Sequence, residues 1–178
     1  MSKGKSRALA WPFLVAAMTI GVLASVGAAA GRPPASGHGN LVSGGELRTF
    51  SFAVTTGADG AVQGHVEVKN RSLGIRIHME VDCFKLEAGS RAIVGGTITQ
   101  SSNPGLIPTG RIGVFGVEDN GEGSDAPADR ITTIPDYAAP KSCTGFAFVG
   151  DTLRDAADPG VVVRTLTPIT AGNIQVRD

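Results

Sequence analysis

The sequence predicts an all-β domain, an antiparallel β-sandwich or barrel of about eight to nine strands. Apolar and polar residues alternate with a period of two along several segments, as half-buried strands require. Sequences that favour tight turns separate these segments. The 178 residues include 25 glycines but only 5% aromatic residues, which suits short strands joined by tight turns. No segment combines helix caps with helical periodicity over ten residues, so we expect no long helix.

The expected strands follow in chain order. Residues 49–54 and 62–68 alternate clearly, and residues 75–83 give the strongest pattern, with Cys83 on the apolar face, in the core. Further strands are predicted at residues 91–99, 111–118, 130–134, 143–149, 161–167 and 172–177. Turns are predicted between them at residues 58–60, 87–89, 103–105, 119–121 and 158–160.

The N-terminal residues have the order typical of a secretory signal peptide. Basic residues precede an uncharged apolar run, residues 8–30, in which Ala28 and Ala30 form a cleavage pattern of small residues. We therefore predict a signal peptide at residues 1–30, a flexible leader at 31–37 and a single β domain at 38–178, in a secreted protein. The alternative is a retained membrane anchor with the domain outside, because the uncharged run is long enough to span a bilayer.

Charge and cysteine content narrow the classes of function. The chain has 16 basic and 16 acidic residues, and three of the basic ones lie in the predicted signal peptide, so the exported part is mildly acidic. No basic patch interleaved with aromatic residues is present, which argues against nucleic-acid binding. Outside the cytoplasm the two cysteines, Cys83 and Cys143, are expected to form a disulfide; two buried thiols are the alternative.

An acidic, glycine-containing segment between two predicted strands is the most distinctive part of the domain. Its oxygen-bearing side chains would suit a calcium ion outside the cell, although their spacing is not that of an EF-hand. The alternative is a solvated hairpin loop in which Asp and Asn side chains bond to their own backbone. The candidate calcium ligands are Asp119, Asn120, Glu122, Asp125 and Asp129.

A second candidate metal site lies on two neighbouring predicted strands. His65 and His78 occupy their polar faces, and Glu67 and Glu80 follow two residues beyond. In a tight hairpin the histidines could approach each other and suit zinc or copper. The alternative is an ordinary polar sheet face with cross-strand pairs.

Catalytic motifs are not assembled in the sequence. The Gly-x-Ser-x-Gly motif of serine hydrolases, a phosphate-binding loop followed by a helix, and a Cys-x-x-Cys pair are missing. A small secreted hydrolase using paired carboxylates such as Glu80 and Asp82 stays open as an alternative. We predict no catalytic residue and no cofactor-binding residue.

Several short blocks resemble the secreted bacterial post-COAP domain family. The distinctive blocks are the acidic segment at residues 117–123 and the closing segment at residues 171–176. The other matching pieces are residues 37–39, 49–52 and 64–66, His78 and Asp129. The chain departs from the family pattern at Gly123 and Ala171. The resemblance implies an exported all-β domain without an established activity, and it supplies no catalytic residues.

Together these observations predict an exported, non-enzymatic structural or interaction domain that needs no cofactor. Its partner would be extracellular or on a cell surface, and it would meet a membrane only if the N-terminal segment is retained as an anchor. The alternative function is calcium binding through residues 119–129.

Overall fold

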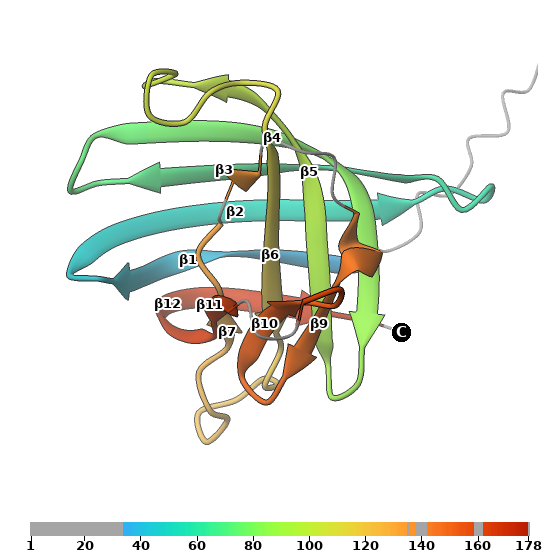
Figure 1. Ribbon diagram of the computed structural model, residues 1–178. Helices are drawn as coiled ribbons and strands as arrows, with labels where there is room; N and C mark the ends of the chain where they lie inside the picture. Colours follow the sequence, from blue (N-terminus) through green and yellow to red (C-terminus); the bar gives the residue numbers. More distant parts are fainter. Residues whose placement is uncertain (1–33, 135, 138–141, 159–161, 178) are drawn as a thin grey trace, which may run out of the picture. The chain divides into compact units, whose positions relative to one another are not determined.

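The described part of the chain forms a closed antiparallel β-barrel. The computed structural model describes residues 34–134, 136–137, 142–158 and 162–177, so the predicted signal peptide lies outside the described residues. Eight strands close in the order β1-β2-β3-β4-β5-β6-β7-β12, and β12 pairs again with β1 (Figure 1). Their bounds are β1 Ala35–Ser43, β2 Glu46–Thr56, β3 Val62–Asn70, β4 Ile75–Glu87, β5 Arg91–Ser101, β6 Ile112–Glu118, β7 Arg130–Ile131 and β12 Thr167–Val176. Of the two predicted architectures, the barrel is the one observed.

Four further strands and one helical turn lie outside the barrel. They are β8 Asp136–Tyr137, the 3-10 turn η1 Cys143–Gly145, β9 Phe146–Val149, β10 Thr152–Asp155 and β11 Val162–Thr165. The strands β11, β10 and β9 form a small sheet of their own, whereas β8 pairs with β6. Among the described residues, no helix has the length and apolarity needed to cross a membrane.

The strand predictions hold best in the middle of the chain. The five segments predicted between residues 49 and 118 correspond to β2 to β6. The strand predicted at 130–134 is limited to the two residues of β7, and that predicted at 143–149 begins with η1. The sequence patterns missed β1, whose first residues, 35–37, had been assigned to the flexible leader.

Glycine explains why β1 lacks a visible alternation. Two of its inward positions are Gly37 and Gly39, which lie opposite Phe52 and Phe50 in the β1–β2 ladder. A Cβ atom on Gly37 would stand 2.6 Å from Cε1 of Phe52, so the missing side chain makes room for the ring. The apolar residue that a strand normally contributes at such a position is supplied here by the neighbouring strand.

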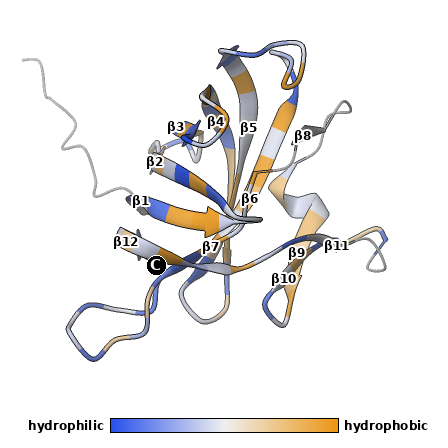
Figure 2. Ribbon diagram, turned by 90° about the vertical axis from the view of Figure 1, so that its left-hand side faces the viewer, coloured by the Kyte–Doolittle hydropathy of each residue, from blue (hydrophilic) through white to orange (hydrophobic). Residues whose placement is uncertain are grey.

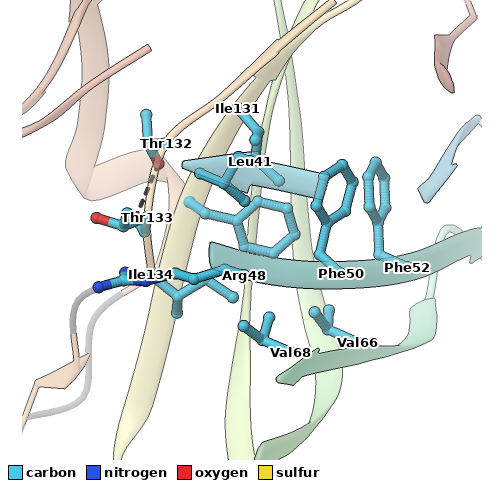
Figure 3. Close-up of a pocket in the computed structure, with 11 residues that line it drawn as sticks. Leu41, Arg48, Phe50, Phe52, Val66, Val68, Ile131, Thr132, Thr133 and Ile134 are labelled. Carbon is cyan, nitrogen blue, oxygen red and sulfur yellow. Dashed lines mark hydrogen bonds between the residues drawn. The ribbon is translucent and has the colours of Figure 1, made fainter. Parts of the chain in front are cut away.

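Side chains fill the interior of the barrel. The rings of Phe52 and Phe115 meet edge to face with centroids 5.5 Å apart, and aliphatic residues from all the long strands surround them. One interior cavity of about 20 Å³ remains, enough for a single water molecule (Figure 3). This barrel is therefore a packed core and not a container, as eight strands allow.

A second apolar cluster covers the outside of β5 and β6. It contains Ile93, Val114, Cys143, Phe146 and Leu153, and it joins the small sheet to the barrel. Both faces of β5 and β6 are consequently buried, and Figure 2 shows the hydrophobic colouring along β6. The glycines on these strands again make room, because a Cβ atom on Gly116 would stand 2.3 Å from Cζ of Phe148.

The predicted disulfide between Cys83 and Cys143 is present, but on the outer face of the barrel. The alternation of β4 places Ile75 to Val81 inside, which predicted an inward Cys83. The ladder with β5 shifts register between Val81 and Cys83, so Asp82 is an extra residue. Such a bulge reverses the direction of the following side chains. Cys83 therefore lies in the outer cluster, and the prediction that it faces the barrel core is wrong.

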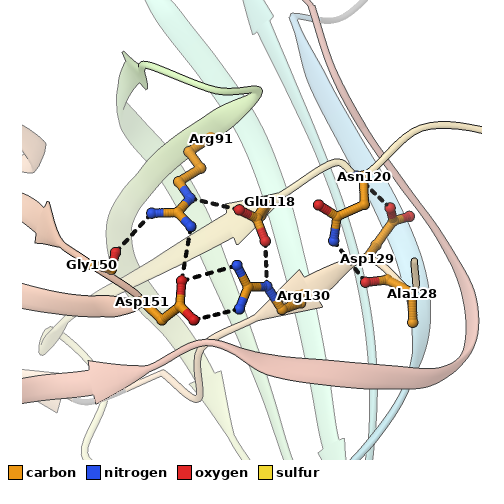
Figure 4. Close-up of polar contacts among 8 residues, drawn as sticks. All are labelled: Arg91, Glu118, Asn120, Ala128, Asp129, Arg130, Gly150 and Asp151. Carbon is orange, nitrogen blue, oxygen red and sulfur yellow. Dashed lines mark hydrogen bonds and ion pairs between the residues drawn. The ribbon is translucent and has the colours of Figure 1, made fainter. Parts of the chain in front are cut away.

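Two arginines and two carboxylates fasten the β9–β10 hairpin to the barrel (Figure 4). Arg91 donates to Glu118 at 2.7 Å, to the carbonyl oxygen of Gly150 at 2.7 Å and to Asp151 at 2.9 Å. Arg130 donates to Glu118 and, at 2.7 and 3.0 Å, to both oxygens of Asp151. The four charges balance within one closed network, and the side chain of Glu118 is only 8% exposed.

We predict that Gly37→Ala destabilises the barrel. The new methyl group would overlap the Phe52 ring, and overpacking of this kind costs about 1–3 kcal/mol. Gly145→Ala is the matched control, because open space surrounds that position, and its free energy of unfolding should stay equal or rise slightly. Urea unfolding of both variants measures the difference; equal stability of the two would contradict the packing explanation.

We also predict an acid-sensitive contribution from Glu118. Burial raises the pKa of this carboxyl, but hydrogen bonds from Arg130 and Arg91 outweigh burial and hold its pKa below the ordinary value. Its stabilisation is therefore complete above pH 4.5 and is lost as the pH falls through the lowered pKa. At pH 7, Glu118→Gln should lower the free energy of unfolding by about 2 kcal/mol or more, because the negative charge between two guanidinium groups is lost and one of its two acceptor oxygens becomes an NH2 donor.

The pH dependence supplies the control for that prediction. The difference between wild type and Glu118→Gln should shrink as urea unfolding is repeated from pH 5 towards pH 3. Glu67→Gln removes an exposed pair with Arg76 and should change stability by less than about 1 kcal/mol. A pH-independent difference for Glu118→Gln would show that its charge is not responsible.

Candidate functional site

The predicted calcium-binding loop joins β6 to β7, and two of its carboxylates bind the backbone of β12. Asp129 is buried and accepts hydrogen bonds from the amide of Ile174 at 2.7 Å and from that of Asn120 at 2.9 Å. Asp119 accepts one from the amide of Val176 at 3.0 Å. These oxygens therefore serve as acceptors for a neighbouring strand.

The other predicted ligands behave differently from one another. Glu122 accepts hydrogen bonds from the side-chain amides of Asn173 at 2.9 Å and Gln175 at 3.1 Å, and these bonds hold its pKa below the ordinary value. Asn120 donates to the carbonyl oxygen of Ala128 at 2.8 Å (Figure 4), whereas Asp125 is exposed. Glu122 thus joins the loop to β12 through side chains alone.

These contacts complete the closure of the barrel. The strand β7 has only two residues, so its ladder with β12 ends at Pro168. After Pro168, the backbone amides of β12 that point towards β7 have no strand to pair with. A buried amide without a hydrogen-bond partner would lower the free energy of unfolding. The carbonyl oxygen of Asp129 accepts a hydrogen bond from the amide of Ile169 at 2.9 Å. Further along β12, the side chains of Asp129 and Asp119 accept from the amides of Ile174 and Val176.

The described residues hold no group of three or more His, Cys, Asp or Glu side chains arranged to bind a metal ion. Calcium binding by the loop stays a prediction, and the geometry gives its carboxylates a structural task instead. The histidine site is also not assembled. His65 stands opposite Glu80 and His78 opposite Glu67, so each histidine faces a glutamate across the β3–β4 ladder. Asp82 is exposed on the outer face of β4.

A groove at one end of the barrel is the strongest candidate for a binding site. We call this end, which carries the connections 44–45, 71–74 and 102–111, the groove end; consecutive hairpins place all three connections there. The groove has a volume of about 370 Å³, within the range of small-molecule sites. Its apolar lining consists of Val68, Leu73, Ile75, Ile77, Leu106, Ile107 and Ile134.

Arg48 lies at the bottom of this groove. It lines both the groove and the interior cavity, together with Thr133 and Ile134 (Figure 3). One terminal nitrogen donates to Glu46 at 2.7 Å, but the buried Nε finds no acceptor among the described residues. Arg164, which donates to Thr133 at 3.0 Å, lines the groove as a second guanidinium group. The charged side chains among the described residues that line the groove are thus Arg48, Arg164 and Glu46.

Sequence reasoning missed this groove, although one signal was present. Arg48 stands in phase with Phe50, Phe52 and Val54, the inward residues of β2. A charged residue at an inward position of a strand is unusual and marks either the mouth of a barrel or a buried polar site. The apolar rim gave no comparable signal, because Leu73 and Leu106 lie between the predicted strands, outside every alternating segment.

Comparisons with known proteins found no matching family model, no matching curated protein and no matching solved structure. The residues of the chain itself therefore carry the functional argument.

We predict that Asp129→Ala destabilises the protein by about 2 kcal/mol or more. The substitution leaves the amides of Ile174 and Asn120 without their acceptor, at about 1–3 kcal/mol for each buried group. The control is Asp125→Ala on the same loop, which should change the free energy of unfolding by about 0.5 kcal/mol or less. Thermal unfolding with and without millimolar calcium measures both effects. A calcium-dependent rise in Tm that both substitutions remove would show a metal site.

Proposed function

We propose that the chain is an exported, non-enzymatic binding domain that takes small amphipathic anions in the groove at its groove end. The observation that carries the proposal is the groove itself, an apolar surface that leads to a guanidinium group with an unused buried donor. The apolar lining can contact the apolar body of a ligand, and the guanidinium group can bind its negatively charged head. The calcium-binding alternative has no comparable observation in its favour.

Charge and size define the ligand class. The Nε of Arg48 has no acceptor among the described residues, which favours an anionic head. The apolar residues favour a short aliphatic or ring-shaped body, and about 370 Å³ limits its length. The packed interior admits about one water molecule, so the ligand would lie at the mouth of the barrel.

The titratable groups of the groove are suited to ligand binding and not to acid–base catalysis. Glu46 accepts hydrogen bonds from Arg48 and Asn70, and these bonds hold its pKa below the ordinary value. It is therefore ionised and occupied near neutral pH, unlike a general acid or base, whose pKa lies near the working pH. Arginine itself stays protonated and serves in recognition.

Two further observations support an exported domain of the post-COAP type. The disulfide between Cys83 and Cys143 suits an oxidising compartment outside the cytoplasm. The two distinctive blocks of the resemblance also meet in space, since Glu122 bonds to Asn173 and Gln175. If the two sequence blocks are kept because of a common fold, they are expected to contact each other in the structure.

We predict that octanoate binds in the groove and that octanol binds about tenfold more weakly or not at all. A hydrogen bond to a charged group contributes about 1.5–3 kcal/mol, which corresponds to tenfold or more. NMR titration should move the backbone signals of residues 71–74 and 102–107. Arg48→Gln should remove the preference for the anion, whereas Arg177→Gln, at the opposite end of the barrel, should leave it unchanged.

A second variant keeps the test informative if Arg48→Gln fails to fold. Leu106 is 60% exposed, so Leu106→Ser should leave the fold intact and weaken octanoate and octanol alike. Shifts confined to other surfaces, or equal binding of both probes by wild type, would contradict the proposed site.

A further inference from the structure

Exposed apolar side chains gather at the groove end. The described residues include six large exposed hydrophobic side chains, and four of them belong to this end. They are Val42, Leu47, Leu73 and Leu106, which are 47, 37, 56 and 60% exposed. Figure 2 views the barrel from this side. Val42 and Leu47 face each other in the β1–β2 ladder, and Leu73 and Leu106, on two connections, line the same groove. Scattered exposed leucines need no explanation, but two that share one groove indicate an interaction surface.

The backbone holds these side chains outward. The amide of Arg71 donates to the carbonyl oxygen of Leu47 at 2.8 Å, and the amide of Leu47 donates to Oγ of Ser72 at 3.1 Å, so two of the connections are joined. In the third, the amides of Leu106 and Ile107 donate to the carbonyl oxygen of Asn103 at 3.1 and 2.9 Å. The connections are therefore ordered by their own hydrogen bonds, and the exposure of the apolar groups is built into them.

Charge separates the two ends of the barrel. Lys69, Arg71 and Arg76 are exposed at or near the groove end, where the acids Glu46 and Glu67 already contact Arg48 and Arg76. The connections of the opposite end carry the acids Asp59, Asp119, Glu122 and Asp125, whereas Glu87, the last residue of β4, pairs there with Lys85. An anionic surface would thus attract the groove end and repel the other one, which orients the approach of the domain.

We propose that the groove end docks on an anionic lipid surface, with Leu73 and Leu106 entering the interface between headgroups and acyl chains. Basic residues beside apolar ones are the combination that binds such surfaces. A folded protein partner would need about 800 Å² of continuous, complementary surface on each side. Here single side chains project from separate turns around a groove, and a fluid lipid interface accommodates them without shape complementarity.

This docking does not depend on the groove taking a ligand. Arg48 lies at the bottom of the groove, whereas the rim residues Leu73, Leu106 and Arg71 are exposed. Arg48→Gln should therefore keep vesicle binding while losing the preference for octanoate. The two proposals can consequently fail separately.

Vesicle co-sedimentation tests the lipid surface directly. The full protein should bind vesicles of equal parts phosphatidylglycerol and phosphatidylcholine at least tenfold more tightly than vesicles of phosphatidylcholine alone, and raised salt should weaken the binding. The double variant Leu73→Ser/Leu106→Ser should lose at least tenfold in affinity. Leu86→Ser/Val149→Ser removes two apolar groups elsewhere that are 42 and 56% exposed, and this variant should bind like wild type. All variants share residues 1–33, so any contribution of that segment cancels.

A charge-matched pair completes the experiment. Arg71→Gln at the groove end and Gln63→Glu near the opposite end each lower the net charge by one, and only the first should weaken binding. Several results would overturn the proposal: no binding to anionic vesicles, equal binding to neutral ones, or equal losses in both variants of either matched pair. A dimer in solution that Leu73→Ser/Leu106→Ser dissociates, without vesicle binding, would identify the rim as a contact between copies of the chain.

Discussion

The closure of the barrel depends on carboxylate side chains that act as a substitute strand. Because β7 ends after two residues, β12 pairs with a full strand only on its β1 side. Asp129 and Asp119 supply the acceptors that a longer β7 would have supplied. An open edge here would expose unpaired amides next to the core residue Ile174 and offer a template for association with other chains. The packed interior, the groove end and the position of the small sheet all depend on this closed geometry.

Glycine residues and the bulge of β4 then determine which side chains fit on the inner and outer faces of the barrel wall. Gly37 and Gly116 make room for aromatic rings on opposite sides of the barrel wall. The extra residue Asp82 directs Cys83 outward, so the disulfide attaches the turn η1 to the outside of the barrel. The two apolar clusters share the wall formed by β5 and β6. This wall is the most buried part of the fold, and the ion-pair network around Glu118 lies at its edge.

The two ends of the barrel consequently have different tasks. One end uses its acidic residues internally, for closure and for the hydrogen bonds between the loop and β12. The other end has an apolar rim and basic groups, and its groove leads to Arg48. The binding and docking that we propose use this second end because Leu73, Leu106 and Arg71 are exposed there. The acidic residues are therefore concentrated at the end of the barrel where Asp119 and Asp129 complete its closure.

The sequence by itself determined the all-β class, the positions of β2 to β6 and the pairing of the only two cysteines, because alternation and turn chemistry are local properties. It did not reveal β1, since its inward glycines carry no apolar signal and gain their meaning only opposite Phe50 and Phe52. It left the acids of residues 119–129 open as calcium ligands or as a solvated loop, because spacing along the chain cannot show that β12 supplies partners for Asp119, Glu122 and Asp129. The groove likewise needed the tertiary structure. Its wall combines connections that are distant in sequence, and only the closing of the barrel brings Leu73, Leu106 and Arg48 to one surface.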